Sequence, residues 1–244
     1  VVVVSPAFKE EIVGKWRIAP EKISLVENGV ETDLFTPEGA TDAAQQALGV
    51  DDRFVVSYIG TLGLAHGLDV VLRAAAQLQR TLPEILFLFV GEGAEKERLV
   101  SRVRTEGLAN VRFLPQQPRE RVSALIRGSH VCLVLLRKAE VFKTVIPTKA
   151  LEFMACGRPV VLGVDGEARR VLEEAQAGLF VEPEDSTALA EGITRLYNSS
   201  KLRKTLGDNG RRYILENLSR ERTAQTYTGV LEQVISNRKR GGAA

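Results

Sequence analysis

The sequence predicts an α/β fold in which helices cover both faces of a parallel sheet. Apolar, β-branched runs typical of strands alternate with helical periods from residue 53 onward. The strand runs are apolar almost throughout, as expected for strands buried on both faces. Right-handed crossovers between parallel strands place the connecting helices on those faces. We therefore predict a doubly wound architecture.

The elements follow one another in a regular order. Six runs have the character of strands: RFVVSYIG, ILFLFVG, NVRFLP, HVCLVLL, RPVVLGV and GLFVEP. The segments between them have the periodicity of helices: GLDVVLRAAAQLQRTL, the charged stretch 94–106, RERVSALIRG, TKALEFMACG and EARRVLEEAQ. From residue 186 onward the pattern is helical only. These last helices should close the edge of a Rossmann-like domain.

The chain divides into five segments. Residues 1–36 contain VVVVSPAFKEEIVGKW and the short strand KISLVENGV, and we interpret them as the remnant of a preceding domain with its crossover, because the chain begins within a strand-like run. We interpret the polar stretch 37–52 as a linker and 53–185 as the Rossmann-like domain. Residues 186–237 form the C-terminal helices, and 238–244 are expected to be a disordered tail.

The composition limits the classes of function. With 44% hydrophobic and 26% charged residues, the chain has the composition of a soluble α/β protein. The formal charge of +2 indicates no nucleic-acid surface, so an anionic ligand needs a local site. Cys132 and Cys156 lie in apolar runs and should be buried thiols. Buried thiols without a disulfide fit a reducing cytoplasm, which is the location we expect. No run approaches the roughly 20 apolar residues of a membrane span, and the cluster Arg238-Lys239-Arg240 is small, so we expect these residues alone to remain soluble.

Ligands of a parallel α/β sheet bind beyond the carboxyl ends of its strands, so the loops there are candidates for the site. The first is Gly60-Thr61-Leu62-Gly63-Leu64-Ala65-His66-Gly67. Its glycines, Gly60 and Gly63 among them, would let backbone amides approach an anion, and a helix beginning there would favour a phosphate. His66 could donate an N–H to a diphosphate. The structural alternative is a tight turn in which His66 caps the helix.

Two further loops are less specific. Gly91-Glu92-Gly93 ends the strand ILFLFV. The glycines could let the chain pass under a flat base or sugar while Glu92 accepts hydroxyl hydrogen bonds. Phe113-Leu114-Pro115 ends the next strand, and its backbone at Leu114 could contact a nucleobase edge. The alternative for this loop is a strand that simply ends at a proline.

The fourth loop carries the most chemistry. A short helix of about ten residues is delimited by Pro147 at its start and Gly157 at its end. The free amides of Thr148 and Lys149 at its N-terminus could bind a diphosphate, with the lysine ammonium and the threonine hydroxyl as further donors. Glu152 lies one turn later on the same face, placed to accept hydrogen bonds from a ribose diol. Alternatively, Lys149 and Glu152 form only an exposed helix pair.

Taken together, these ordered segments resemble the C-terminal domain of glycosyltransferase family 4, a group with the GT-B fold that transfers sugars from nucleotide donors with retention of configuration. The resemblance covers nearly all of the chain. It begins at Val4-Ser5 and Glu27-Asn28-Gly29-Val30, continues through Gly60 and Gly91-Glu92-Gly93, and ends with LEFMACGRPVV. It implies that residues 53–185 bind a nucleotide sugar.

The departures from the family pattern are informative. The family commonly has two glutamates separated by seven residues; Glu152 matches the second, but Thr144 occupies the position of the first. The usual arginine and lysine of the first loop fall on Thr61 and His66. The combination resembles a subgroup of bacterial envelope-polysaccharide transferases that add amino sugars to lipid-linked acceptors. Lys143 and Lys149 are then candidates to replace the missing positive charge.

The resemblance implies a retaining glycosyltransferase that needs no metal or other cofactor and uses a UDP-sugar or another NDP-sugar as donor. The acceptor, a glycan or a lipid-linked sugar, would bind through the missing N-terminal domain, which would also hold unidentified catalytic groups. The full enzyme would then meet the inner face of the membrane peripherally. Three alternatives remain open: a GT-B-type sugar-nucleotide 2-epimerase, a nicotinamide-dependent dehydrogenase, for which the expected GxGxxG is absent, and a non-catalytic nucleotide-binding module.

Overall fold

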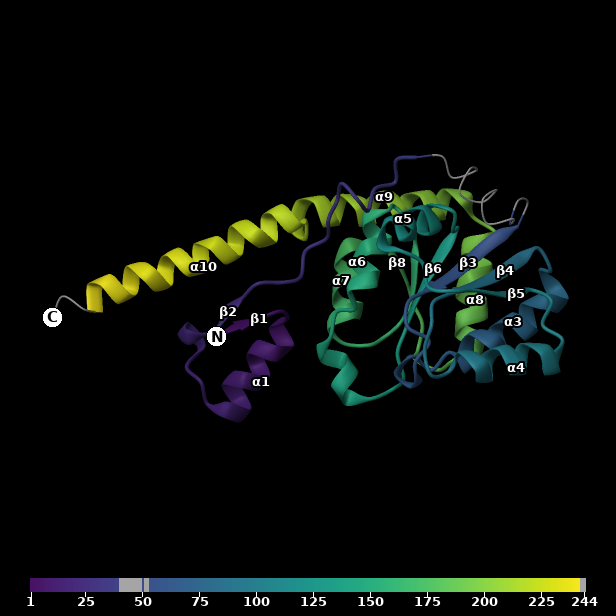
Figure 1. Ribbon diagram of the computed structural model, residues 1–244, viewed down its shortest axis with the longest axis horizontal. Helices are drawn as coiled ribbons and strands as arrows, with labels where there is room; N and C mark the ends of the chain where they lie inside the picture. Colours follow the sequence, from purple (N-terminus) through teal and green to yellow (C-terminus); the bar gives the residue numbers. More distant parts are fainter. Residues whose placement is uncertain (40–49, 51–52, 242–244) are drawn as a thin grey trace.

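The computed structural model describes residues 1–39, 50 and 53–241, and side chains as far as residue 236 (Figure 1). A six-stranded parallel sheet forms its centre, with strand order β5-β4-β3-β6-β7-β8. This confirms the predicted fold class. The strands are β3 (Phe54–Ile59), β4 (Ile85–Val90), β5 (Val111–Leu114), β6 (Val131–Leu135), β7 (Val160–Gly163) and β8 (Gly178–Phe180).

Helices cover both faces of the sheet, as the apolar strands predicted. One face packs against α3 (Asp69–Thr81), α4 (Lys96–Glu106) and α8 (Ser186–Tyr197). The other packs against α5 (Arg119–Arg127), α6 (Thr148–Ala155) and α7 (Glu167–Ala175). Helix α9 (Ser200–Asn217) contributes Leu206 to the first of these clusters and Ile214 to the second, so it closes the edge between them.

The two-residue alternation of a strand explains how β3 serves both clusters. Val56 and Tyr58 enter the first cluster, whereas Val55 and Ile59 enter the second. All six residues of β3 and of β4 are buried. The two cysteines also behave as predicted: Cys132 and Cys156 are both buried free thiols.

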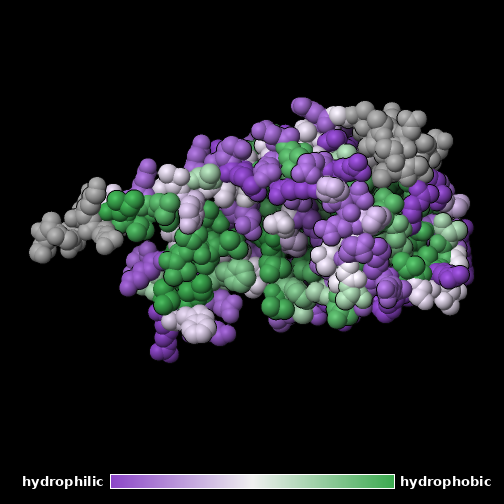
Figure 2. All heavy atoms as spheres, in the orientation of Figure 1, coloured by the Kyte–Doolittle hydropathy of each residue, from purple (hydrophilic) through white to green (hydrophobic). Residues whose placement is uncertain are grey.

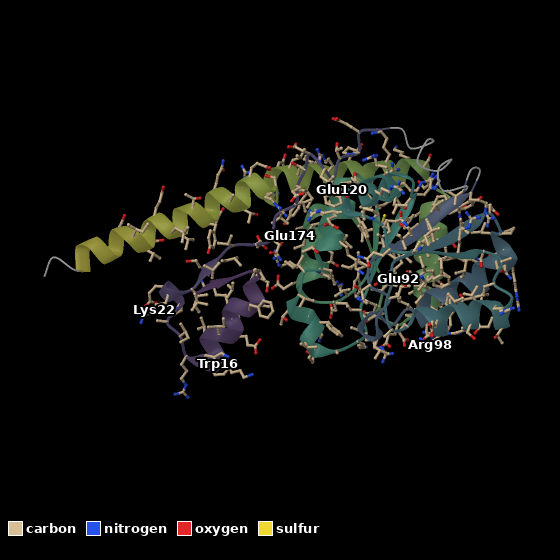
Figure 3. All side chains as sticks on the ribbon, in the orientation of Figure 1. Trp16, Lys22, Glu92, Arg98, Glu120 and Glu174 are labelled. Carbon is tan, nitrogen blue, oxygen red and sulfur yellow. The ribbon has the colours of Figure 1, made fainter. Side chains whose placement is uncertain are left out.

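The N-terminal segment is a small unit beside the sheet (Figure 1). Strands β1 (Val2–Val3) and β2 (Ser24–Leu25) pair in parallel, joined by α1 (Pro6–Trp16) and the 3-10 turn η1 (Pro20–Lys22). The Ser5 hydroxyl caps α1 by accepting a hydrogen bond from the amide of Phe8 at 3.3 Å. No residue of α1 is fully buried, and Trp16 lies on its outer side with 66% of its surface exposed (Figure 3).

The chain crosses from this segment to the sheet beside the last two helices. The amide of Val30 donates to the carbonyl of Leu218 at 2.9 Å, and the amide of Arg220 donates to the carbonyl of Val30 at 2.8 Å. Gly29 lies so close to this junction that an added Cβ would come within 2.5 Å of Thr223 Oγ1. Two passages of chain, far apart in sequence, are therefore joined by backbone hydrogen bonds.

Helix α10 (Arg220–Gly241) then extends past the sheet and over the N-terminal segment (Figure 1). Figure 2 shows hydrophobic residues gathered on that segment and along the outer part of α10, where Leu231, Val234 and Ile235 are exposed. The backbone is helical to Gly241, and the disordered tail expected for residues 238–244 remains a prediction. The side chains of Arg238-Lys239-Arg240 and most of the expected linker, residues 40–49 and 51–52, lie outside the described part. No described helix is long and apolar enough to span a membrane.

Candidate functional site

A cavity of about 430 Å³ lies at the carboxyl edge of the sheet, where the loops after β3, β4 and β5 meet the N-terminus of α6. Eight of the residues predicted from sequence line this cavity: Gly60, Thr61, His66, Gly91, Glu92, Thr148, Lys149 and Glu152. The loops that the sequence identified separately therefore form one site. Its remaining lining residues are Ile59, Val90, Gln116, Gln117, Val122 and Pro147.

The glycines of the first two loops allow close backbone contact. An added Cβ at Gly91 would lie 2.0 Å from the carbonyl oxygen of Gly60, and one at Gly93 would lie 2.4 Å from that of Leu62. The amide of Leu62 donates to the carbonyl of Glu92 at 2.8 Å, so the hydrogen-bonded pairing of the strands continues into the loops. These glycines are explained by the approach of one loop to the other. Gly93 does not line the cavity.

The helix after the first loop differs from the expectation. A 3-10 turn, η2 (Leu64–His66), intervenes, and α3 begins only at Asp69. The Asp69 carboxylate pairs with Arg98 and Arg102 of α4, at 2.8 and 2.6 Å. No residue of α3 lines the cavity. The start of α3 therefore does not face the cavity, and α6 is the helix whose N-terminus opens on it.

His66 extends from η2 into the cavity, and it is not a helix cap. Its Nδ1 lies 3.3 Å from the carbonyl oxygen of Leu135, which can only accept a hydrogen bond. Nδ1 therefore carries a proton, and Nε2 can donate only in the imidazolium form. Burial, followed by the nearby charge of Lys149, lowers the pKa of His66, and the bond to Leu135 partly opposes this. A bound anion would have the opposite effect on the pKa.

Lys149 brings positive charge to the centre of the site. It occupies the second position of α6, and its Nζ donates to the hydroxyl of Tyr58 at 3.0 Å and lies 4.1 Å from the centre of that ring. The same Nζ is 3.5 Å from the Cβ position of Gly60, so it reaches the first loop. Burial lowers the pKa of Lys149 to about 7. Lys149 is therefore a cation that an anionic ligand would stabilise.

The N-terminus of α6 adds unpaired donors beside this lysine. Pro147 occupies the cap position and provides no side-chain hydrogen bond. Within the described part of the chain, no acceptor is found for the amides of Thr148 and Lys149. The helix spans eight residues, slightly shorter than the sequence suggested, but it begins where it was expected. Its first turn therefore presents two amides and an ammonium to the same cavity.

Glu152 follows Thr148 by one helical turn and also lines the cavity, half-buried. Among the described residues, no hydrogen bond or ion pair of its carboxylate is found. Burial raises the pKa of Glu152, which the charge of Arg119 partly offsets. Arg119 itself pairs with Glu31 at 3.1 Å, on the side of Glu152 where a smaller cavity lies. The alternative of a Lys149–Glu152 helix pair is not found, because the lysine is bonded to Tyr58.

Glu92 lies on the loop after β4, at the rim of the cavity (Figure 3). Its carboxylate accepts a hydrogen bond from Lys96 Nζ at 2.6 Å, at the start of α4. The side chain is exposed, and this pairing leaves the second carboxylate oxygen to accept bonds from a ligand. Glu92 is thus in the predicted place with a partner that the sequence did not indicate.

Five of the predicted residues do not line the cavity: Gly63, Gly93, Leu114, Lys143 and Thr144. The carbonyl of Leu114 accepts from the amide of Gly91 at 3.2 Å, so it continues the pairing of the sheet. Lys143 lies on the 3-10 turn η3 (Glu140–Thr144) and pairs with Glu140 at 2.7 Å. The hydroxyl of Thr144 donates to the carbonyl of Val141 at 3.1 Å.

Sequence reasoning missed two polar residues of the site, Gln116 and Gln117. They come directly after Pro115, at the end of β5, so the rule that ligands bind beyond strand ends would have found them if it had been applied past the proline. The side-chain Nε2 of Gln117 donates to the carbonyl of Pro115 at 3.1 Å. The described residues contain no group of three or more His, Cys, Asp or Glu side chains that could hold a metal ion.

Comparison with known proteins identifies relatives that match most of this chain. The family described as "Glycosyl transferases group 1" matches residues 41–213. A D-inositol 3-phosphate glycosyltransferase of Salinispora arenicola is 31% identical over 238 residues, which cover 91% of this chain and 51% of that protein. The chain thus spans about half the length of the curated relatives it matches.

Solved structures show the same fold. HepE of Anabaena, solved with UDP and glucose, superposes with a TM-score of 0.81 at 21% identity, covering 97% of this chain and 62% of HepE. The C-terminal domain of the group 1 glycosyl transferase LpcC of Francisella tularensis superposes with a TM-score of 0.69 at 21% identity, covering 79% of this chain and all of that domain. The chain therefore has the fold of the C-terminal domain of a GT-B protein, and it belongs to the group 1 glycosyl transferases.

Proposed function

We propose that this chain is the donor-binding half of a retaining glycosyltransferase and that it binds a UDP-sugar or another NDP-sugar in the cavity at the carboxyl edge of the sheet. One observation carries the proposal: the cavity has Lys149 and the free amides of α6 at one place and the unpaired carboxylate of Glu152 one turn away. A nucleoside diphosphate has the matching chemistry, a diphosphate beside a ribose diol.

In this proposal each group has one role. Lys149, the first-turn amides of α6 and protonated His66 stabilise the diphosphate, on which negative charge develops as the sugar leaves. Glu152 accepts hydrogen bonds from the ribose hydroxyls. Because these groups supply the positive charge, the reaction would need no metal ion. HepE, whose fold this chain shares, was solved in complex with UDP-glucose, which supports a uridine nucleotide as the first ligand to test.

A more specific proposal concerns a protein of the full length of the relatives, of which this chain would be about half. We propose that it transfers an amino sugar to a glycan or lipid-linked acceptor in envelope polysaccharide synthesis, working in the cytoplasm at the inner face of the membrane. Support comes from the resemblance of GTLGLAHGLD and FKTVIPTKALEFMACG to that subgroup. Thr61 and Thr144, at positions where the wider family carries charge, agree with it. Lys143 is not needed, because it is paired with Glu140.

The test is calorimetric titration of the chain with UDP, comparing Glu152→Gln with a matched control. Glu120→Gln is that control, because Glu120 is an exposed carboxylate on α5 that does not line the cavity (Figure 3). Loss of the hydrogen bonds to a ribose should weaken UDP binding by about 1.5–3 kcal/mol in Glu152→Gln. The control should bind as the wild type does. Equal affinity in all three proteins, or no binding of UDP, GDP or their sugars to the wild type, would refute the proposal.

A further inference from the structure

The side chain of Tyr58 lies beneath the cavity without lining it. It is 1% exposed, and its ring packs 6.1 Å from the ring of Phe89. Its hydroxyl is 2.8 Å from the carbonyl oxygen of Thr61 and 3.0 Å from Nζ of Lys149. A carbonyl only accepts, so the hydroxyl donates its one hydrogen to Thr61 and accepts from Lys149 with a lone pair. One buried oxygen thus contacts both the first loop and the cation of the site.

The same side chain holds the ammonium in two ways. Besides the hydrogen bond, the centre of the ring lies 4.1 Å from Nζ, within the range of a favourable cation–π contact. These contacts place Nζ 3.5 Å from the Cβ position of Gly60, at the boundary between the first loop and α6. A lysine side chain has four rotatable bonds, so without such contacts its charge would have no defined place in the cavity.

We infer that Tyr58 is a positioning residue of the nucleotide site, whose hydroxyl keeps the Lys149 ammonium charged and holds it at the Gly60 edge of the cavity, where a diphosphate binds. This inference rests on the proposed function. Tyr58 itself does not touch the ligand. It acts through Lys149, and through the carbonyl of Thr61 it also fixes the shape of the loop.

The Tyr58 hydroxyl should affect ligand binding through the protonation state of Lys149. The Tyr58 hydroxyl from β3 is bonded to the amine, and the other titratable groups that line the same cavity are His66 from η2, Glu92 from the loop after β4 and Glu152 from its own helix. Glu92 is already paired with Lys96. Burial lowers the pKa of Lys149 to about 7. A hydrogen-bond acceptor for the ammonium opposes this lowering. Removing the hydroxyl should therefore leave less of the lysine charged, and the loss should grow as pH rises above 7.

The experiment compares Tyr58→Phe with the wild type by calorimetric titration with UDP at pH 6 and pH 8. Phenylalanine keeps the ring, its packing and its contact with the ammonium. Because UDP and His66 also titrate in this range, the informative quantity is the ratio of variant to wild-type affinity at each pH. Tyr197→Phe is the matched control, because the Tyr197 hydroxyl bonds to Glu84 away from the cavity. Lys149→Met is measured in parallel.

We expect Tyr58→Phe to bind UDP about tenfold more weakly than the wild type at pH 8 and about twofold more weakly at pH 6, with Tyr197→Phe unchanged at both. Two results would overturn the inference: equal affinity of Tyr58→Phe and the wild type at both pH values, or an equal loss at both with a lower melting temperature, which indicates a purely structural role. If Lys149→Met binds as the wild type does, the inference also fails. If the wild type does not bind UDP, it is the proposed function that fails.

Discussion

Replacing Lys149 by methionine should stabilise the folded protein at neutral pH while it removes nucleotide binding. Methionine keeps the apolar stem and much of the length of lysine but carries no charge. Burial lowers the pKa of Lys149 from 10.5 to about 7, so the folded protein at neutral pH holds an ammonium in a place that disfavours it. The charge of Lys149 thus lowers the stability of the ligand-free protein, and a bound anion would offset this loss.

The size of the effect follows from the pKa. Each pKa unit corresponds to about 1.4 kcal/mol, so the difference between 10.5 and about 7 amounts to about 5 kcal/mol if the amine is shielded from water. The side chain is only partly buried, and water screens part of this penalty. The variant also loses the hydrogen bond and ring contact with Tyr58, together about 1–2 kcal/mol. We expect a net increase of about 1–3 kcal/mol in the free energy of unfolding at pH 7.

The sign of the pH dependence gives the sharper test. The folded-state pKa is lowered, so the unfolded chain binds more protons between pH 7 and 10.5, and the free energy of unfolding of the wild type should rise with pH in that window. Methionine does not titrate, so the free energy of unfolding of the variant lacks this rise with pH. The difference in free energy of unfolding between variant and wild type should therefore become smaller as pH rises. Urea denaturation at pH 6.5 and pH 9.5 measures both proteins. Lys201→Met, an exposed lysine of α9, is the control and should stay within about 0.5 kcal/mol of the wild type. A variant less stable than the wild type at pH 6.5, or a gap equal at both pH values, would refute the reasoning.

Three more predictions concern the loops, the thiols and the source of charge. Gly91→Ala should lose at least about 2 kcal/mol of stability in urea denaturation, because its Cβ would meet the Gly60 carbonyl at 2.0 Å. Gly14→Ala on α1, where nothing lies within 4 Å, should instead gain up to about 1 kcal/mol, and equal effects would contradict this account. Burial raises the pKa of Cys132 to about 12 and that of Cys156 to about 11, so a disulfide reagent at pH 8 should label neither thiol until urea is added; rapid labelling of the native protein would be the contrary result. UDP binding should persist in EDTA, since Lys149, His66 and α6 supply the positive charge, and an affinity that collapses on chelation and returns with Mg²⁺ would argue against it.

Much of the fold could be predicted because its signals are local. The four central strands, β4, β3, β6 and β7, are apolar and buried on both faces. The helices between the strands have clear apolar stripes, so the order of these elements alone implies a parallel sheet covered on both sides. Because the loops after parallel strands lie at one edge of the sheet, Gly60, Glu92 and Lys149 could be predicted to lie close together. In the structure they line one cavity. The division of the chain into segments at residues 36, 52, 185 and 237 remains a prediction.

The direction of individual side chains could not be predicted in the same way. Lys143 and Lys149 are only six residues apart and have the same charge, yet one pairs with Glu140 on a 3-10 turn and the other turns back to Tyr58. Sequence spacing does not reveal which of the two meets a buried hydroxyl from a strand about ninety residues away. The glycines show the same limit, because Gly93 lies against the carbonyl of Leu62 and does not line the cavity.

The hydrogen-bonded junction at Val30 is one of the contacts that restrain the N-terminal segment relative to the sheet domain. Two lengths of chain meet at this junction, the crossing itself and the start of α10, and the bonds of Val30 to Leu218 and Arg220 fasten them together. Bending both lengths together preserves the bonds, whereas twisting or sliding one past the other breaks them at about 1 kcal/mol each. Gly29, which has no room for a side chain against Thr223, is where the two layers touch most closely. The segment is also held directly to the sheet domain, because the Ser5 hydroxyl donates to the carbonyl of Thr144 at 2.9 Å and the amide of Ala7 donates to the Glu167 carboxylate at 3.1 Å. A substitution at Gly29 would therefore push the crossing away from α10 while these contacts still hold the segment in place.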